Sequence, residues 1–127
     1  MPSEKDNKMA IIPLNAFRNI AVKLTTSDQL IYTTPSGVST IILSAVCSNY
    51  TTNDVPVTFK IEKTVIVGGT PTTTQYYIVP GIDVIAKDVF SVVSGRLVLE
   101  AGDKLYASAG SNNAIDYVMS VNEAANE

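Results

Sequence analysis

Apolar side chains fall on every second position near the C-terminal end of the chain, at Ile115, Tyr117, Met119 and Val121, while Asp116 and Ser120 take the other face. A period of two predicts a β-strand that buries one face and exposes the other. Shorter apolar runs precede this strand at 97–99 and 105–109, and runs rich in Gly, Asp and Asn separate the three segments. The stretch 97–121 therefore predicts the last three strands of an all-β domain.

The rest of the chain shows the same period in short segments bounded by Gly, Pro, Asn, Asp and Ser. The alternation is clearest at 55–61, whereas the segment 39–48 is apolar on both faces, which predicts a central strand. Strands are expected at 20–24, 30–33, 39–48, 55–67, 72–79, 82–86 and 89–93, and the segment 9–14 is expected to be a short edge strand or extended entry limited by Pro13.

This spacing predicts an all-β fold with two antiparallel sheets packed as a jelly-roll-like β-sandwich. An Ig-like sandwich is the alternative, although the chain lacks the Cys, Trp, Cys arrangement of true Ig domains. A length of 127 residues suits one domain. We expect residues 15–127 to form the sandwich and residues 1–14 to form an extended N-terminal arm.

The segments 55–67 and 72–79 predict a long hairpin, because Gly68-Gly69-Thr70-Pro71 interrupts the alternation between them. Pro80-Gly81 is expected to end the returning strand. The tip, residues 68–74, is uncharged and rich in Thr, so it is expected to project beyond the sandwich. Tyr76 and Tyr77 place one ring on each face of the returning strand, which suits a surface partly covered by another chain.

The first eight residues, MPSEKDNK, are polar and balanced in charge, and such a segment does not order by itself. A neighbouring subunit is one natural partner for it, and the surface of its own domain is the other. Lys5, Lys8 and Met9 are therefore candidate partner-binding residues.

Composition excludes several classes of partner. The net charge is -3, and the nine basic residues are scattered singly, so no stripe exists to follow a nucleic-acid backbone. The N-terminus lacks an apolar segment long enough for a signal peptide, and no run is long enough to cross a membrane. We therefore expect a chain that is made in cytosol and binds neither nucleic acid nor membranes.

The chain has few side chains of the kinds that carry out catalysis. The chain has no histidine and one cysteine, which removes the usual zinc, iron and copper sites and every His-dependent triad. We expect Cys47 to be a small buried hydrophobe. Asp83 with Asp88, or Glu100 with Asp103, are possible acid–base or calcium pairs, but each lies beside a predicted turn where carboxylates are ordinarily solvated.

The expected protein is therefore not an enzyme and has no cofactor or metal. The six tyrosines offer one further possibility, a sugar-binding cleft, against the ordinary roles of core filling and subunit contact.

The order of these segments resembles that of small β-sandwich virion proteins of tailed bacteriophages. The resemblance covers residues 30–123 and consists of 30–35, 40–48, 57–61, Tyr76-Tyr77, Ile82, Asp88, Phe90, 97–99, Ala101-Gly102-Asp103, 105–111 and the closing strand through Glu123. It implies a structural component of the virion, most simply a capsid decoration or cement protein. Such a component would bind the major capsid protein or other virion subunits, and would commonly form homo-oligomers.

Two alternatives stay open at this point. One places the same fold in the neck, tail or baseplate, and the other makes it a carbohydrate- or receptor-binding module that uses the hairpin. The candidate partner-binding residues are Lys5, Lys8, Met9, Gly68, Gly69, Thr70, Tyr76 and Tyr77.

Overall fold

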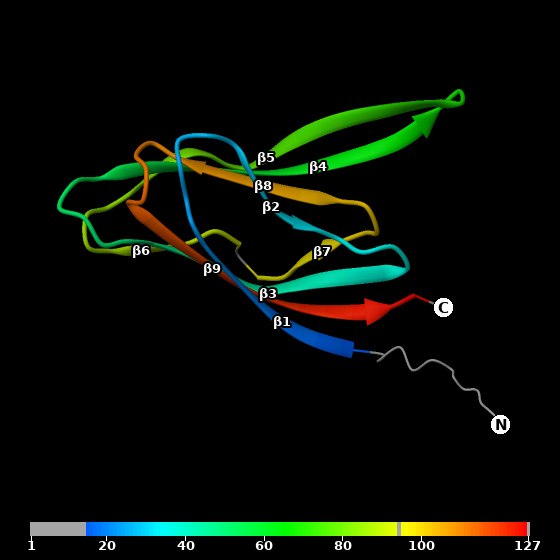
Figure 1. Cartoon of the computed structure of the whole chain (residues 1–127), viewed down its shortest axis with the longest axis horizontal. Helices are drawn as coiled ribbons and strands as arrows, with labels where there is room; N and C mark the ends of the chain where they lie inside the picture. The colour runs from blue at the N-terminus through cyan, green and yellow to red at the C-terminus, as the bar shows by residue number, and fades with distance from the viewer. Residues whose placement is uncertain (1–14, 94, 127) are drawn as a thin grey trace.

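The computed structural model describes residues 15–93 and 95–126, and these residues form nine strands (Figure 1). None of the described residues lies in a helix that is long and apolar enough to cross a membrane. The strands are β1 (Asn15–Lys23), β2 (Gln29–Thr33), β3 (Val38–Asn49), β4 (Val55–Val67), β5 (Thr70–Val84), β6 (Val89–Ser91), β7 (Leu97–Leu99), β8 (Lys104–Ala109) and β9 (Ile115–Ala125).

Two antiparallel sheets face one another, as Figure 1 shows. One has the order β1-β9-β3-β6, with β7 also paired to β3, and the other has the order β2-β8-β4-β5. If β7 is set aside, the order of the remaining strands in the two sheets is that of a jelly roll, a fold that consists of two Greek keys. The predicted jelly-roll-like sandwich is confirmed, and the Ig-like order is absent.

The core lies between the sheets and follows the two-residue period directly. Ile115, Tyr117, Met119 and Val121 of β9 are all fully buried. The ring of Tyr117 packs on that of Phe59 from the opposite sheet, with 5.3 Å between centroids. β9 lies between β1 and β3, so this strand is paired on both edges within its sheet.

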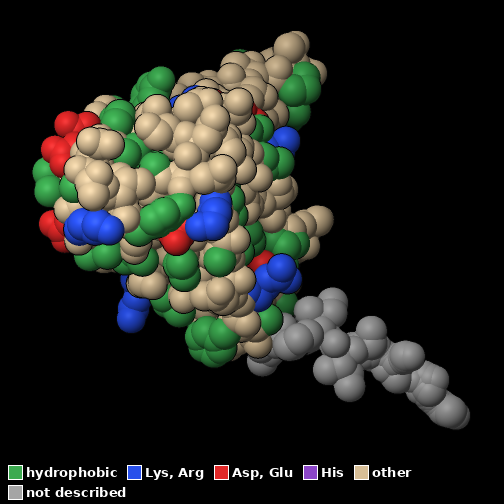
Figure 2. Space-filling model, turned by 60° about the vertical axis from the view of Figure 1, so that its left-hand side comes forward, with side chains coloured by type: hydrophobic (Ala, Val, Ile, Leu, Met, Phe, Trp, Pro, Cys, Tyr) green, Lys and Arg blue, Asp and Glu red, His purple; other side chains and the backbone are tan. Residues whose placement is uncertain are grey.

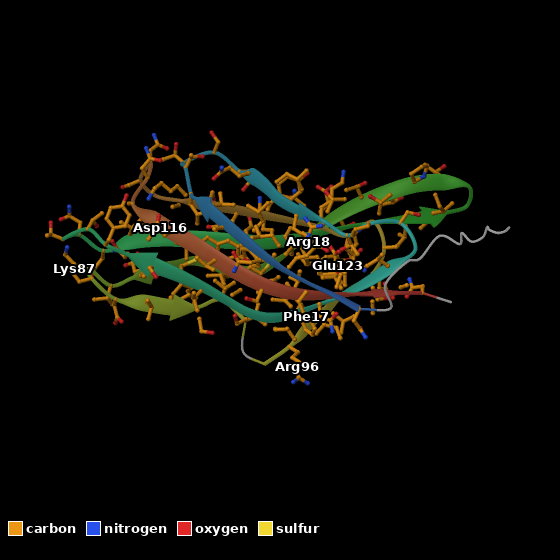
Figure 3. The ribbon with its side chains drawn as sticks, turned by 60° about the horizontal axis from the view of Figure 1, so that its bottom comes forward. Phe17, Arg18, Lys87, Arg96, Asp116 and Glu123 are labelled. Atoms are coloured by element: carbon orange, nitrogen blue, oxygen red, sulfur yellow. The ribbon has the colours of Figure 1, made fainter. Side chains whose placement is uncertain are left out.

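A polar contact joins the sheets near one end of this core. The hydroxyl of Tyr32 on β2 hydrogen-bonds to Thr40 Oγ1 at 2.8 Å and donates to the carboxylate of Glu123 on β9. Arg18 Nε lies 3.8 Å from the same carboxylate (Figure 3). Glu123 of β9 is therefore held by a side chain of the other sheet.

One predicted boundary is wrong. Pro80-Gly81 does not end the returning strand, because β5 continues to Val84 and stays paired with β4. The register shifts there, so Gly81 is an extra residue with φ of 72°. A glycine bulge therefore absorbs the break without ending the pairing.

The expected strand at 82–86 is thus the end of β5 rather than a separate element. The predicted arm, residues 1–14, and the expected strand at 9–14 lie outside the described residues, so both stay predictions.

Replacing Tyr32 with Phe should make the free energy of unfolding fall less steeply as the pH rises in alkaline solution. Burial, together with the bond to Glu123, raises the pKa of Tyr32 from 10.0 to about 12. The unfolded chain therefore loses this proton first, and the folded state is progressively destabilised as pH rises through that interval. Urea unfolding at successive pH values should show a steeper decline for the wild type than for Tyr32→Phe between pH 10 and 12. Equal slopes would contradict this assignment.

Candidate assembly surfaces

The hairpin of β4 and β5 extends well beyond the rest of its sheet (Figure 1). β8 pairs with β4 only from Val57 to Glu62, whereas β5 pairs with β4 as far as Val67. From Lys63 onward the hairpin is therefore a two-stranded ribbon. Beyond Glu62 the outer edge of β4 is therefore unpaired, and a two-stranded ribbon of this kind is only marginally stable on its own.

The tip of this ribbon is uncharged and apolar in part. Gly68 and Gly69 have φ values of 58° and 82°, as a two-residue type I′ turn requires. The side chains just before the turn are largely exposed: Val65 by 51%, Ile66 by 67% and Val67 by 63%. Hydrophobic side chains are visible on the projecting arm in Figure 2, with few charged groups near them. The tip therefore presents apolar area to solvent.

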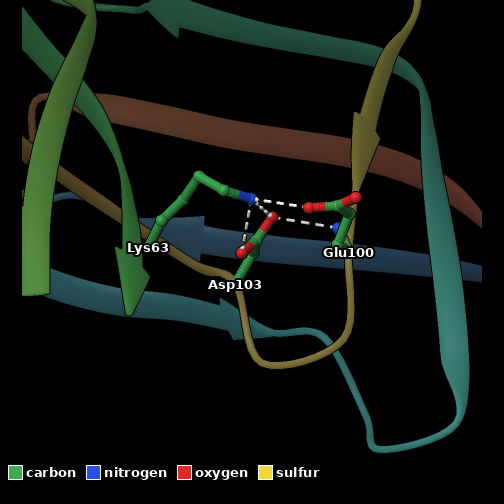
Figure 4. A network of polar contacts seen from close by, with 3 residues as sticks. All are labelled: Lys63, Glu100 and Asp103. Atoms are coloured by element: carbon green, nitrogen blue, oxygen red, sulfur yellow. Dashed lines mark hydrogen bonds and ion pairs between the residues drawn. The ribbon is translucent and has the colours of Figure 1, made fainter. Parts of the chain in front are cut away.

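An ion-pair network holds the base of the hairpin to the turn between β7 and β8 (Figure 4). Lys63 Nζ lies 2.8 Å from Asp103 Oδ2 and 3.1 Å from Glu100 Oε1. Asp103 Oδ2 also accepts the backbone N–H of Glu100 at 2.9 Å. The hydrogen bond to Asp103 raises the pKa of Lys63. The suggested carboxylate pair Glu100–Asp103 is thus bridged by a lysine, which offsets one of its two negative charges.

A second lysine supports the middle of the hairpin. Lys60 is largely buried and makes an ion pair with Asp28, and that bond raises the pKa of Lys60. Its Nζ also lies 5.6 Å from the ring centroid of Tyr77, within the range of a cation–π contact. The described part of the hairpin is therefore anchored at two points, and its tip is the part that stays uncovered.

Tyr76 and Tyr77 do not lie on one face of the hairpin. Tyr76 and Tyr77 are exposed by 53% and 65%, but as neighbours on one strand they point to opposite faces. Tyr32 and Tyr117 lie in the core. Tyr76 and Tyr77 together offer no shared platform on which one sugar would stack.

A second exposed surface lies on the far side of the sheet β1-β9-β3-β6. We define the outer face as the outward-pointing side chains of four cross-strand rows, which the strand register fixes. They are Asn15, Ala124 and Ser39; Phe17, Asn122, Ile41 and Val98; Asn19, Ser120 and Ser44; and Ala21, Val118, Val46 and Ser91.

The outer face carries large exposed apolar groups and no formal charge. Phe17 is exposed by 74% and Val98 by 58%. A bulge in β3 between Ile42 and Ser44 adds Leu43, which is also exposed. The next row holds Lys23 and Asp116, which pair with each other at 2.7 Å. Asp116 lies at the opposite end of the sheet from Phe17 (Figure 3).

Reactive groups in the described part of the chain are few. Burial raises the pKa of the Cys47 thiol to about 12, so this side chain stays a neutral thiol at ordinary pH, as a small buried hydrophobe would. Asp88 caps its own turn by accepting the N–H of Val89 at 2.7 Å, and Asp83 lies on the exposed end of β5. Among the described residues no three acidic, histidine or cysteine side chains gather as a metal site would require.

The candidate partner-binding residues fall in separate places. Gly68, Gly69 and Thr70 lie together at the hairpin tip, whereas Tyr76 and Tyr77 lie on β5 opposite Ile61 and Lys60. Lys5, Lys8 and Met9 lie outside the described residues. Sequence reasoning missed the outer face, although the lack of charge at the non-core positions 15–21 of β1 and 118–124 of β9 was a usable signal.

No protein-family model matches the chain, and no curated protein matches its sequence. Two solved structures are similar in fold. A chain of the T13 IBDV viral particle superposes with a TM-score of 0.52 at 7% identity, covering 90% of this chain and 32% of that chain. A chain of the Bacillus endospore appendages, described as disulfide-linked pili, gives a TM-score of 0.47 at 14% identity, covering 89% and 88%.

The viral-particle match shows a shared fold and nothing finer. This chain spans about a third of the length of the viral chain, given the 32% coverage. The likeness to the pilus chain is weaker and supports no inference.

The two acidic partners of Lys63 should differ greatly in their effect on stability. Asp103 is 5% exposed and serves both Lys63 and the Glu100 backbone, so Asp103→Ala should lower the free energy of unfolding by about 2–3 kcal/mol. The side chain of Glu100 is 77% exposed, so Glu100→Ala should change the free energy of unfolding by less than about 0.5 kcal/mol. Urea denaturation of both variants measures the difference, and equal effects would contradict the assignment.

Proposed function

We propose that this chain is a non-enzymatic structural subunit of a tailed-bacteriophage virion, which decorates and cements the head by binding capsid subunits. The observation that carries the proposal is the anchored hairpin, whose uncharged and partly apolar tip stands clear of the sandwich. The fold shared with a chain of a viral particle supports it.

The hairpin fits an assembly role for a physical reason. An isolated two-stranded ribbon is marginally stable in water, and exposed apolar patches commonly mark protein contacts. Here Val65, Ile66 and Val67 are exposed on such a ribbon, while Lys63 and Asp103 fix its base. A rigid base loses little conformational entropy when the tip is bound, so more of the contact energy is retained.

Assembly in many copies would make a modest contact sufficient. Each tip offers only a few apolar side chains, which suits a weak interface. Several such contacts on one particle act together through multivalency. A virion location and the capsid protein as partner follow from this proposal. The neck, tail or baseplate would use the same surfaces at lower copy number.

A carbohydrate- or receptor-binding role is less well supported. Aromatic platforms for sugars need a ring face that is open, and Lys60 lies over the ring of Tyr77 at 5.6 Å. Tyr76 lies on the opposite face of the ribbon. Glycan binding that is lost in both Tyr76→Ala and Tyr77→Ala would nevertheless establish that role and overturn the present one.

Binding of the purified chain to virions stripped of it tests the proposal. The wild type should rebind in high copy, and Val67→Asp should weaken rebinding about tenfold or more, because it places a charge in a desolvated contact. Ile85→Asp is the matched control: Ile85 is 54% exposed and lies just beyond the other end of β5, so rebinding should change by less than about twofold.

Failure of the wild type to rebind would contradict the proposal, as would equal loss in both variants. A copy number of only a few per virion would indicate that the protein belongs to the neck, tail or baseplate instead of the head.

A further inference from the structure

We propose that residues 9–12 of one copy of this chain add, as an antiparallel strand, to the free edge of β4 in a neighbouring copy. We define the free edge as residues 64–67, which lie beyond the pairing of β4 with β8 and beyond Lys63. The inference goes beyond the proposed function. It concerns a contact between two copies that uses backbone groups, whereas the capsid contact uses the side chains of the hairpin tip.

The free edge is open to a further strand. β8 stops at the pair of Lys104 with Glu62, and the hairpin continues past it (Figure 1). Among the described residues no strand pairs with residues 64–67 on the side away from β5. Their outward N–H and C=O groups are therefore a template for another chain.

The other edge of the hairpin is protected, which singles out β4. β5 is the last strand of its sheet and carries Pro71 and Pro80, which have no N–H to offer a further strand. The bulge at Gly81 distorts the same edge. Residues 64–67, Thr-Val-Ile-Val, contain neither proline nor charge, and all four are β-branched. Such a sequence favours strand pairing.

Residues 9–12, Met-Ala-Ile-Ile, match the free edge in length and character. They are apolar and uncharged, and Pro13 follows them, which limits a ladder to this short segment. Residues 1–8 include four charged side chains, which would lie beside the exposed valines and isoleucine of the edge. Cross-strand pairs between apolar side chains stabilise a sheet, so residues 9–12 are the better partner.

The position of β1 relative to the free edge decides which copy supplies the segment. The hydroxyl of Tyr32 on β2 bonds Thr40 of β3, and Lys63 on β4 bonds Glu100 in the turn after β7. β8 lies between β2 and β4, so it faces β3 or the strand beyond it, and β1 lies two strands away from β3. A strand on the free edge would continue the line of β8.

The segment of the same copy is too short to reach this line. Two strand spacings of about 4.8 Å and a sheet separation of about 10 Å place Asn15 roughly 14 Å from it. The three residues from Ile12 to Asn15 span at most about 11 Å. The β7–β8 turn, which joins the two sheets at the base of the free edge, also lies across the direct path. A neighbouring copy has no such tether, so the occupant is its segment.

Sedimentation equilibrium of the full-length chain tests the inference. A contact of four residues is small, so we expect wild-type self-association with a dissociation constant on the order of 100 μM, which many copies on one particle would reinforce. Ile11→Pro should raise this constant at least about tenfold, because proline removes a backbone donor from the added strand. Ile11→Val is the matched control and should stay within about twofold. Equal melting temperatures of the two variants would show that the fold is kept.

Nuclear magnetic resonance on mixed copies locates the contact. A ¹⁵N-labelled Ile11→Pro chain keeps the free edge but lacks a segment that can pair. Unlabelled wild-type chain supplies that segment, so adding it should shift the amide resonances of residues 64–67 in the labelled chain. Adding unlabelled Ile11→Pro instead should leave these resonances in place.

Three outcomes would overturn the inference. A wild type that stays monomeric to about 1 mM makes no such contact. A folded Ile11→Pro that associates like the wild type places the contact elsewhere. Differences at residues 64–67 between wild type and Ile11→Pro that persist at every dilution would make the segment of the same copy the occupant. Rebinding to stripped virions by a wild type that does not self-associate would leave the proposed function standing while this inference fails.

Discussion

The two-residue period of the strands is the constraint on which the rest of the molecule depends. Each strand gives one side to the space between the sheets, and in β9 that side is filled without a gap by Ile115, Tyr117, Met119 and Val121. The same period leaves every second residue facing away from the core. Each sheet covers only the inner face of the other. The outer faces, and any strand that extends beyond its sheet, are therefore left exposed and available to partners.

Within this constraint, the exposed surfaces differ from an ordinary solvated exterior. Three lysines in the described part of the chain make ion pairs: Lys63 with Asp103, Lys60 with Asp28, and Lys23 with Asp116. These pairs lie at the base and the middle of the hairpin and at one end of the sheet, whereas the hairpin tip and the four rows of the outer face are uncharged. This partition supports the proposal that the uncharged surfaces are the ones that meet neighbours.

Much of the fold could be predicted from sequence, because alternation is local. The strands at 97–99, 105–109 and 115–121, the central strand and the long hairpin all follow from it. The predicted strand end at Gly81 was wrong because glycine is found in bulges as readily as in turns. Only the pairing of β5 with β4 distinguishes a bulge from a turn there. Phe17 and Glu123 could not be placed, since their surroundings come from strands distant in sequence. The hairpin tip was predictable as a candidate site, whereas the outer face was not, because its rows are assembled from strands distant in sequence.

Hydrogen–deuterium exchange on the free chain and on the chain assembled in virions measures most directly whether function resides in these surfaces. We predict that amides at 64–73 exchange rapidly in the free protein and become strongly protected on assembly, while the amides of β9, already protected by two neighbouring strands, change little. Unchanged exchange at the hairpin tip together with unchanged exchange across β1 would contradict the account, because the exposed surfaces would then be uncovered in the working state.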